Sequence, residues 1–281
     1  MASPPASRAV VETDAAVSPV VVVGGATKVF RGTHALDGVS CTILPGQFGA
    51  IVGKSGAGKT TLLRCLACAI TLTGGSIRFG EQDVGALRGR ALRRHRARVG
   101  MIYQQFNLVK RLRVIDNVLV GRLAHLGRRG RWLALARHFD GREQAVALRC
   151  LDHVGLLDRV WQRTDTLSGG EQQRVAIAKI LAQQPEVILA DEPIASLDIS
   201  NGTLVLDTLR RTASRAGLTV ITTLHHIDVA RRHADRIIGL RDGRVVFDGT
   251  PAQMNETAML DIFGELPAEY LTATVGRRAA S

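Results

Sequence analysis

The sequence predicts an α/β fold in which a largely parallel β-sheet is buried on both faces. Two short runs, Val187–Ala190 and Thr219–Thr223, are continuously apolar or β-branched, as is typical of strands buried on both faces. A third run, Phe48–Val52, precedes a glycine-rich loop and a helical pattern over Thr60–Ile70. The 281 residues are 46% hydrophobic, which is enough for a sizeable core, and an aromatic content of 4% argues against an all-β sandwich.

The other elements follow from the same periodicity rules. Strands are expected at Val20–Val23, Ser76–Phe79 and Val99–Tyr103, and a closing hairpin at Ile237–Leu240 and Arg244–Phe247. Helices are expected at 171–183, Gly202–Arg215 and Asp228–Ala234. Residues 105–167 show helical periodicity without a strong strand run, and we interpret them as a helical insert.

The chain divides into three expected regions. Residues 1–18, rich in Ala, Ser and Pro, are expected to form a flexible leader, 19–250 the folded domain, and 251–281 a tail with a short helix. There is no run of 18 apolar residues and no secretory signal at the N-terminus. The four cysteines form no disulfide framework, so a reduced, cytosolic chain is the default.

The chain is strongly basic, with 37 Lys+Arg against 25 Asp+Glu and a formal net charge of +12. Such a balance fits nucleic acid, an anionic membrane surface, a phosphorylated ligand, or an arginine-rich composition alone. The densest run, Leu87–Arg98, lacks the aromatic residues that stack on bases. We therefore expect a solvated helix face there and no nucleic-acid partner.

Residues 53–60 (GKSGAGKT) match all eight positions of the G-x-x-x-x-G-K-[ST] pattern, between a β run and a helix. The glycines let the backbone wrap closely around phosphate oxygens, and the positive end of the following helix faces the anion. Lys59 is placed to reach the β- and γ-phosphates, and Thr60 can offer its hydroxyl to Mg²⁺. The expected nucleoside-triphosphate site comprises Gly53, Lys54, Ser55, Gly56, Ala57, Gly58, Lys59, Thr60 and Thr61.

The apolar run over 187–190 ends in two acidic residues, Asp191 and Glu192. A strand-end aspartate beside a phosphate loop can hold Mg²⁺ through water, and the next glutamate can polarise the attacking water. Solvated acids often end strands, so the pair is a weak signal by itself. Pro193 stops the strand from continuing.

Residues 167–174 (LSGGEQQR) form a glycine-rich helix start. Ser168 and the amides of Gly169 and Gly170 can bind an anion at the helix N-terminus. The simpler interpretation is a capping box, in which Ser168 caps the helix and Glu171 bonds back to it. With the phosphate loop upstream and the acidic strand end downstream, the segment resembles the signature of the ATP-binding cassette (ABC) family.

Four further residues match motifs of that family in the same order. Phe30 stands where the family stacks an aromatic ring on adenine, and Gln104 where a glutamine touches Mg²⁺ and the attacking water. Asp198 stands in the segment where the family has a loop that crosses the dimer interface. His225 stands where the family has a histidine at the γ-phosphate. Phe30 as a core residue and Asp198 as a loop cap are the structural alternatives, and His226 is a neighbouring candidate for the histidine.

The resemblance covers about residues 20–250. It implies a P-loop NTPase (RecA-like) core with an antiparallel β subdomain and an α-helical subdomain at about 105–167. It implies ATP and Mg²⁺ as cofactors. The implied catalytic residues are Lys59, Gln104, Glu192 and His225, and the implied Mg²⁺ ligands are Thr60, Gln104 and Asp191. In this family the signature of one subunit closes over the ATP of the other, which implies a homodimer. The translocation path would lie on integral-membrane permease subunits, and a periplasmic binding protein would deliver the substrate to them. This chain would be bound peripherally at the cytoplasmic face of the inner membrane.

Some stretches, such as THALDGVS (33–40) and ILADEPIASLD (188–198), resemble the ATPase subunits of bacterial phosphonate importers. The expected function is therefore ATP hydrolysis that powers uptake of phosphonate or a related phosphorus oxyanion. Lys54 and Ile199 stand where the family often has proline, and neither change removes a catalytic group. Alternatives are a lipoprotein-release or macrolide-type exporter, an amino-acid importer, a soluble ABC ATPase acting on DNA or ribosomes, and a P-loop kinase.

Overall fold

The structure, a computed structural model, describes residues 18–127, 130 and 139–266. Its strands are β1 (Val21–Phe30), β2 (Thr33–Ile43), β3 (Phe48–Val52), β4 (Gly74–Phe79), β5 (Gln82–Asp83), β6 (Val99–Ile102), β7 (Val187–Ala190), β8 (Thr219–Leu224), β9 (Arg236–Arg241) and β10 (Arg244–Gly249). Its α-helices are α1 (Lys59–Leu66), α2 (Gly89–Arg98), α3 (Val114–Val120), α5 (Gly141–His153), α6 (Gly169–Ala182), α7 (Ile199–Ala216), α8 (Ile227–His233) and α9 (Glu256–Phe263). The expected leader, apart from Ser18, and the tail beyond residue 266 lie outside the described residues.

The central sheet has six strands in the order β10-β9-β3-β8-β7-β6. β9, β3, β8, β7 and β6 are parallel to their neighbours, and β10 closes the edge as an antiparallel hairpin with β9. Every residue of β3, β7 and β8 is buried, in agreement with their continuous apolar runs. The predicted α/β fold is confirmed.

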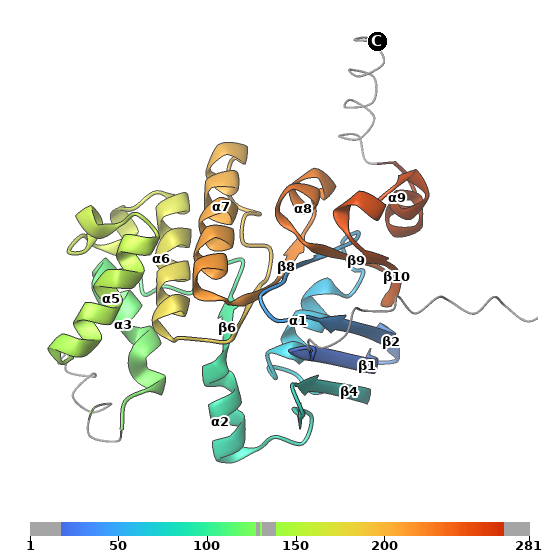
Figure 1. The fold of residues 1–281 in the computed structure, drawn as a ribbon, viewed down its shortest axis with the longest axis horizontal. Coiled ribbons are helices and arrows are strands. Elements are labelled where there is room, and N and C mark those ends of the chain that lie inside the picture. Colours follow the sequence, from blue (N-terminus) through green and yellow to red (C-terminus); the bar gives the residue numbers. More distant parts are fainter. Residues whose placement is uncertain (1–17, 128–129, 131–138, 267–281) are drawn as a thin grey trace, which may run out of the picture.

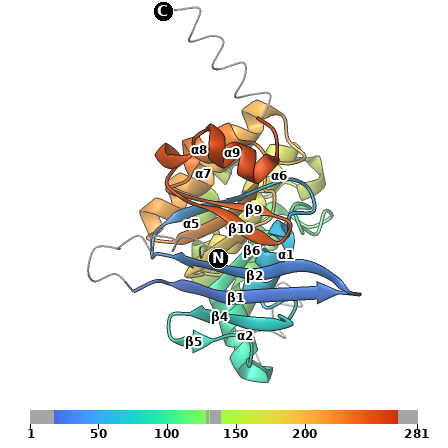
Figure 2. The same cartoon turned by 90° about the vertical axis from the view of Figure 1, so that its right-hand side faces the viewer.

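The N-terminal part forms a separate antiparallel sheet in the order β2-β1-β4-β5 (Figure 2). β2 is absent from the strands expected from the sequence, although it is 11 residues long. The alternation of buried and exposed side chains along β2 is interrupted near Gly38, which adopts φ 69°. The pairing of β2 with β1 also contains register shifts. Pairing with β1, rather than its own residue pattern, makes this segment a strand.

Helices α3, α5 and α6 pack together at one end of the molecule (Figure 1). A buried ion pair between Arg122 and Glu143 links the turn after α3 to α5. The same arginine donates from Nη1 to the carbonyl oxygen of Ala182 (2.7 Å) and to Oε1 of Gln184 (2.9 Å). One guanidinium therefore connects the helical insert to the C-terminal end of α6.

The core lies on both faces of the central sheet. Alternate residues of β3 contribute to different clusters, because Ala50 packs with the large helical cluster and Ile51 with the cluster under β1, β2 and α1. The four cysteines are free. None of the described helices has the length and apolar character needed to cross a membrane.

Glu143→Ala should lower the free energy of unfolding by about 3–5 kcal/mol, because it leaves the Arg122 guanidinium buried without its carboxylate. Urea denaturation measures this loss. The matched control is Glu186→Ala, which removes the carboxylate from Arg98, an exposed pair expected to contribute below about 1 kcal/mol. Equal losses in the two variants would contradict the role given to the buried pair.

Candidate functional site

The candidate site lies where three parallel strands end side by side. β3, β8 and β7 are neighbours in the central sheet, so their carboxyl ends share one edge. The phosphate loop follows β3, Asp191 and Glu192 follow β7, and His225 follows β8. In open α/β sheets ligands bind at this edge, outside the carboxyl ends of the strands.

Two glycines of the phosphate loop are required by their surroundings. Gly53 has φ 152° and Gly58 has φ 100°, values that side chains rarely allow. A Cβ atom at Gly53 would lie 2.2 Å from the carbonyl oxygen of Leu240, and one at Gly58 would lie 2.4 Å from that of Ala35. Gly58 also begins α1 without a side-chain cap, which leaves the first amides of the helix available to an anion.

The other loop residues are arranged around Lys59. Its Nζ donates to the carbonyl oxygens of Gly53 (2.8 Å) and Lys54 (3.0 Å), and the residue is 4% exposed. Burial lowers the pKa of Lys59, while the negative charges of Glu192 and Asp191 act in the opposite direction. Ser55 and Gly56 are exposed, Ala57 is buried, and Thr60 and Thr61 are half-buried.

Asp191 joins the phosphate loop to the neighbouring strand ends. Its Oδ1 accepts hydrogen bonds from the hydroxyls of Thr60 and Thr223, both at 3.0 Å. Oγ1 of Thr223 in turn accepts from the backbone N–H of Glu192 at 2.8 Å. Thr223 is fully buried and was not among the expected site residues. The only signal for it in the sequence is a hydroxyl at the end of a buried strand, next to the expected histidine.

Glu192 and His225 face each other across the strand ends. Nε2 of His225 lies 2.5 Å from Oε1 of Glu192, within hydrogen-bond distance. Glu192 adopts φ 48°, a left-handed conformation that costs a non-glycine residue about 1–3 kcal/mol and that recurs at active sites. The N–H bond to Thr223 holds the backbone in this conformation.

Gln104 lies at the same sheet edge but makes no contact with the carboxylate. Ile102 of β6 pairs with Ala190 of β7, and the N–H of Asp191 donates to the carbonyl oxygen of Ile102 at 2.9 Å. Gln104 is therefore two residues past the paired position, where it is exposed. Among the described residues its side chain has no hydrogen-bond partner.

Asp198 shares a hollow of about 460 Å³ with Glu192 and His225. It caps α7, because its Oδ1 accepts from the N–H of Asn201 (2.9 Å) and from the hydroxyl of Ser200 (2.6 Å). These bonds, the backbone one first, hold the pKa of Asp198 well below its usual range. Asp198 is therefore the N-cap of α7, and it lies on the wall of the hollow.

The signature segment forms a second cluster with the loop that holds Asp198. Ser168 caps α6 in a capping box with Glu171, as the simpler interpretation predicted. The backbone N–H of Ser168, followed by its hydroxyl, lowers the pKa of Glu171. A Cβ atom at Gly169 would lie 3.2 Å from Leu197, and one at Gly170 would lie 3.1 Å from Oδ1 of Asn201.

The structure does not bring this second cluster to the phosphate loop within one chain. α6 packs on α3, α5, α7 and β6, whereas α1 packs on β2 (Figure 1). Phe30 ends β1 and so belongs to the antiparallel sheet, not to the central sheet that carries the carboxylates. Phe30 is 45% exposed, and Nζ of Lys28 lies 4.9 Å from its ring centre, so the interpretation of Phe30 as a core residue is wrong.

The chain is similar in sequence and in structure to known proteins of one family. The family model described as "ABC transporter" matches residues 36–195, more than half of the chain. A "Phosphonates import ATP-binding protein PhnC 2" of Rhodopseudomonas palustris (strain BisA53) is 48% identical over 87% of this chain and 89% of its own length. A "Phosphonates import ATP-binding protein PhnC" of Bradyrhizobium diazoefficiens is 47% identical over 87% of this chain and 90% of its own. A solved dimeric structure of the ATP-binding cassette MJ0796, in a post-hydrolysis state with ADP and Pi, superposes with a TM-score of 0.71 at 33% identity, over 82% of this chain and 98% of that one.

Thr223→Val keeps the shape of the side chain but removes the hydroxyl that joins Asp191 to the Glu192 backbone. The variant should therefore impair the site. The half-buried N–H of Glu192 would lose its acceptor, which should lower the free energy of unfolding by about 1 kcal/mol, and ATP hydrolysis should fall. Thr222→Val is the matched control, since Thr222 is equally buried and its hydroxyl makes only a long bond of 3.5 Å. Denaturation and hydrolysis assays on both variants test this, and equal hydrolysis rates would contradict it.

Proposed function

The chain belongs to the ABC transporter family, and from that premise we propose that it is the ATP-hydrolysing subunit of an importer for phosphonates or related phosphorus oxyanions. The relatives that are 47–48% identical over most of their length carry the name of phosphonate import proteins. The observation that carries the ATPase part is the shared carboxylate, because Asp191 accepts from Thr60 of the phosphate loop while the adjacent Glu192 faces His225.

The donor set at the sheet edge fits Mg²⁺. Mg²⁺ prefers oxygen ligands and is usually held by one or two carboxylates together with substrate phosphates. The Asp191 carboxylate and the Thr60 hydroxyl already lie 3.0 Å apart, and Gln104 follows the neighbouring strand. These three residues would hold the ion. When bound, Mg²⁺ would neutralise charge on the β- and γ-phosphates.

Each remaining residue has a role that its position supports. Lys59 and the amides at the start of α1 would bind phosphate oxygens and stabilise the charge that develops on them. Glu192 would orient the attacking water and accept its proton at a carboxylate oxygen. His225 would position the Glu192 carboxylate and contact the γ-phosphate. Phe30, with its exposed ring, is the candidate for stacking on adenine.

Two chains are needed for a complete site in this proposal. The signature at residues 167–174 belongs to the helical half of the chain and the phosphate loop to the other half (Figure 1). In a head-to-tail homodimer, Ser168 and the Gly169 and Gly170 amides of one chain would close over the ATP of the other. The dimeric structure of the MJ0796 cassette, which is 32% identical to this chain, supports the dimer of this proposal. Asp198, beside the signature, would lie at the contact between the chains.

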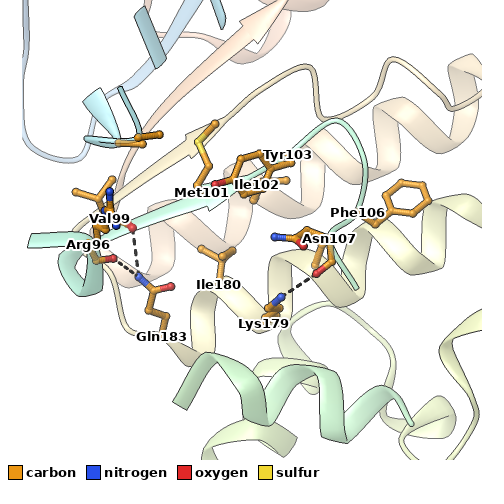
Figure 3. A pocket seen from close by; sticks show the side chains of 13 residues that line it. Arg96, Val99, Met101, Ile102, Tyr103, Phe106, Asn107, Lys179, Ile180 and Gln183 are labelled. Atoms are coloured by element: carbon orange, nitrogen blue, oxygen red, sulfur yellow. Dashed lines mark hydrogen bonds between the residues drawn. The ribbon is translucent and has the colours of Figure 1, made fainter. Parts of the chain in front are cut away.

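A second hollow, of about 460 Å³, is the candidate contact for a permease subunit (Figure 3). It lies between β6, the segment that follows it and α6, and the exposed Tyr103 and half-buried Phe106 give it an aromatic rim. Lys179 braces the segment by donating to the carbonyl oxygen of Asn107 at 2.8 Å. Because Gln104 belongs to this same segment, a permease helix seated here would act directly on the ATP site. Such docking would hold the chain peripherally at the cytoplasmic face of the inner membrane.

Glu192→Gln should lower ATP hydrolysis by about 10²–10⁴-fold, because an amide cannot accept the proton of the attacking water. ATP binding should persist, so the variant should accumulate as an ATP-bound dimer in size-exclusion chromatography with light scattering. Glu81→Gln, an exposed position away from the site, is the control and should hydrolyse ATP normally. Hydrolysis by Glu192→Gln at the wild-type rate would show that the base is assigned wrongly.

The importer part has a separate test. In cells that depend on this transporter for growth on methylphosphonate as the phosphorus source, Glu192→Gln should abolish growth and Glu81→Gln should sustain it. Growth on phosphate should be unaffected in both. Normal growth of a strain lacking this chain on methylphosphonate would reject the substrate while leaving the ATPase assignment intact.

A further inference from the structure

A hollow of about 450 Å³ lies among α5, α6 and α7, outside the ATP site and the candidate permease contact. Figure 1 shows α6 between α5 and α7, and the hollow is lined by all three helices. Its charged lining consists of Arg174 from α6, Arg211 and Arg215 from α7, and Asp152 from α5, with His153 beside the aspartate. The positive charges therefore outnumber the negative ones.

Within the described ranges, none of the three arginines of this hollow has an acceptor, in contrast to the arginines that are paired with carboxylates elsewhere in the fold. Arg98, Arg163, Arg210 and Arg236 each direct two nitrogens at one carboxylate, of Glu186, Asp165, Asp235 and Asp248 respectively. In the described part of the chain, neither a hydrogen bond nor an ion pair is found for Arg174, Arg211 or Arg215. The Nε of Arg174 is buried and without a partner, which leaves a desolvated donor uncompensated.

The face of α7 that lines the hollow concentrates this charge. Leu204, Thr208, Arg211 and Arg215 are spaced four, three and four residues apart, so they form one stripe along the helix. Arg211 and Arg215 are therefore neighbours of like charge, an arrangement that destabilises an isolated helix. The hydroxyl of Thr208 donates its proton to the carbonyl oxygen of Leu204 at 2.7 Å, so it has no proton to donate to an anion. A bound anion would compensate the two arginines.

We infer that this hollow binds a small dianionic phosphorus oxyanion, of the phosphate or phosphonate class. Guanidinium groups present planar forks of N–H donors that match the oxygen pairs of such anions. The volume falls within the range of small-ligand sites, roughly 300–1,000 Å³. Leu204, which is 45% exposed, and Val154 form an apolar wall beside the arginines, suited to the carbon substituent of a phosphonate. The inference rests on the hollow alone and holds whatever substrate the transporter carries.

Isothermal titration of the full chain with methylphosphonate and with inorganic phosphate tests the site. The titrations are made at 0.15 M NaCl with the phosphate loop filled by Mg²⁺ and a non-hydrolysable ATP analogue. The double variant R211Q/R215Q removes the charge of the α7 stripe. Its matched control is R231Q/R232Q, which removes two exposed arginines from α8. Both double variants keep every residue of the ATP site, and thermal melting checks that both are folded.

The wild type and R231Q/R232Q should each bind one oxyanion per chain. R211Q/R215Q should bind at least about tenfold more weakly, since charge-assisted hydrogen bonds are lost. Methylphosphonate binding at least as tightly as phosphate would support the use of the apolar wall. The inference is overturned if the wild type binds neither anion, or if the two double variants bind them equally well.

Discussion

The Asp191 carboxylate accepts hydrogen bonds from Thr60 and Thr223, and these two bonds connect the ends of β3, β7 and β8. They can form only because the three strands are adjacent and parallel, with their carboxyl ends at one edge. The left-handed backbone of Glu192, held by Thr223, then directs its side chain toward His225. The position of each acidic group thus depends on the strand order of the central sheet.

The same fold places the proposed functional groups in two separate sets. The phosphate loop and the strand-end acids form one set, and the signature at residues 167–174 forms the other with the start of α7. Asp198 is the link between them, because it caps α7 beside the signature and also lines the hollow next to Glu192. A dimer that joins the two sets would make hydrolysis depend on how two chains approach each other.

The structure also gives the charge of +12 a more specific meaning. Several arginines form two-bonded pairs with carboxylates and contribute to structure, and Arg122 ties the helical insert to α6 from a buried position. Lys59 lies within the phosphate loop. Among the described residues, Arg174, Arg211 and Arg215 line one hollow and have no acceptor there, which is why we propose that they bind an anion.

The sequence by itself determined the phosphate loop, the acidic strand end, the signature and the buried strands β3 and β7, whose bounds were predicted without error. These features are local: a glycine pattern, a capping box and a continuous apolar run each depend on residues adjacent in the chain. The tertiary structure decided the features that depend on how strands pair with one another. β2 became a strand only through its partner β1, and Thr223 became part of the site because the register that pairs Ala190 with Thr222 brings its hydroxyl to Asp191. The sequence pattern fixes which face a residue occupies within its own element, but which residue of a neighbouring strand it meets is set by register, and register is a property of the assembled sheet.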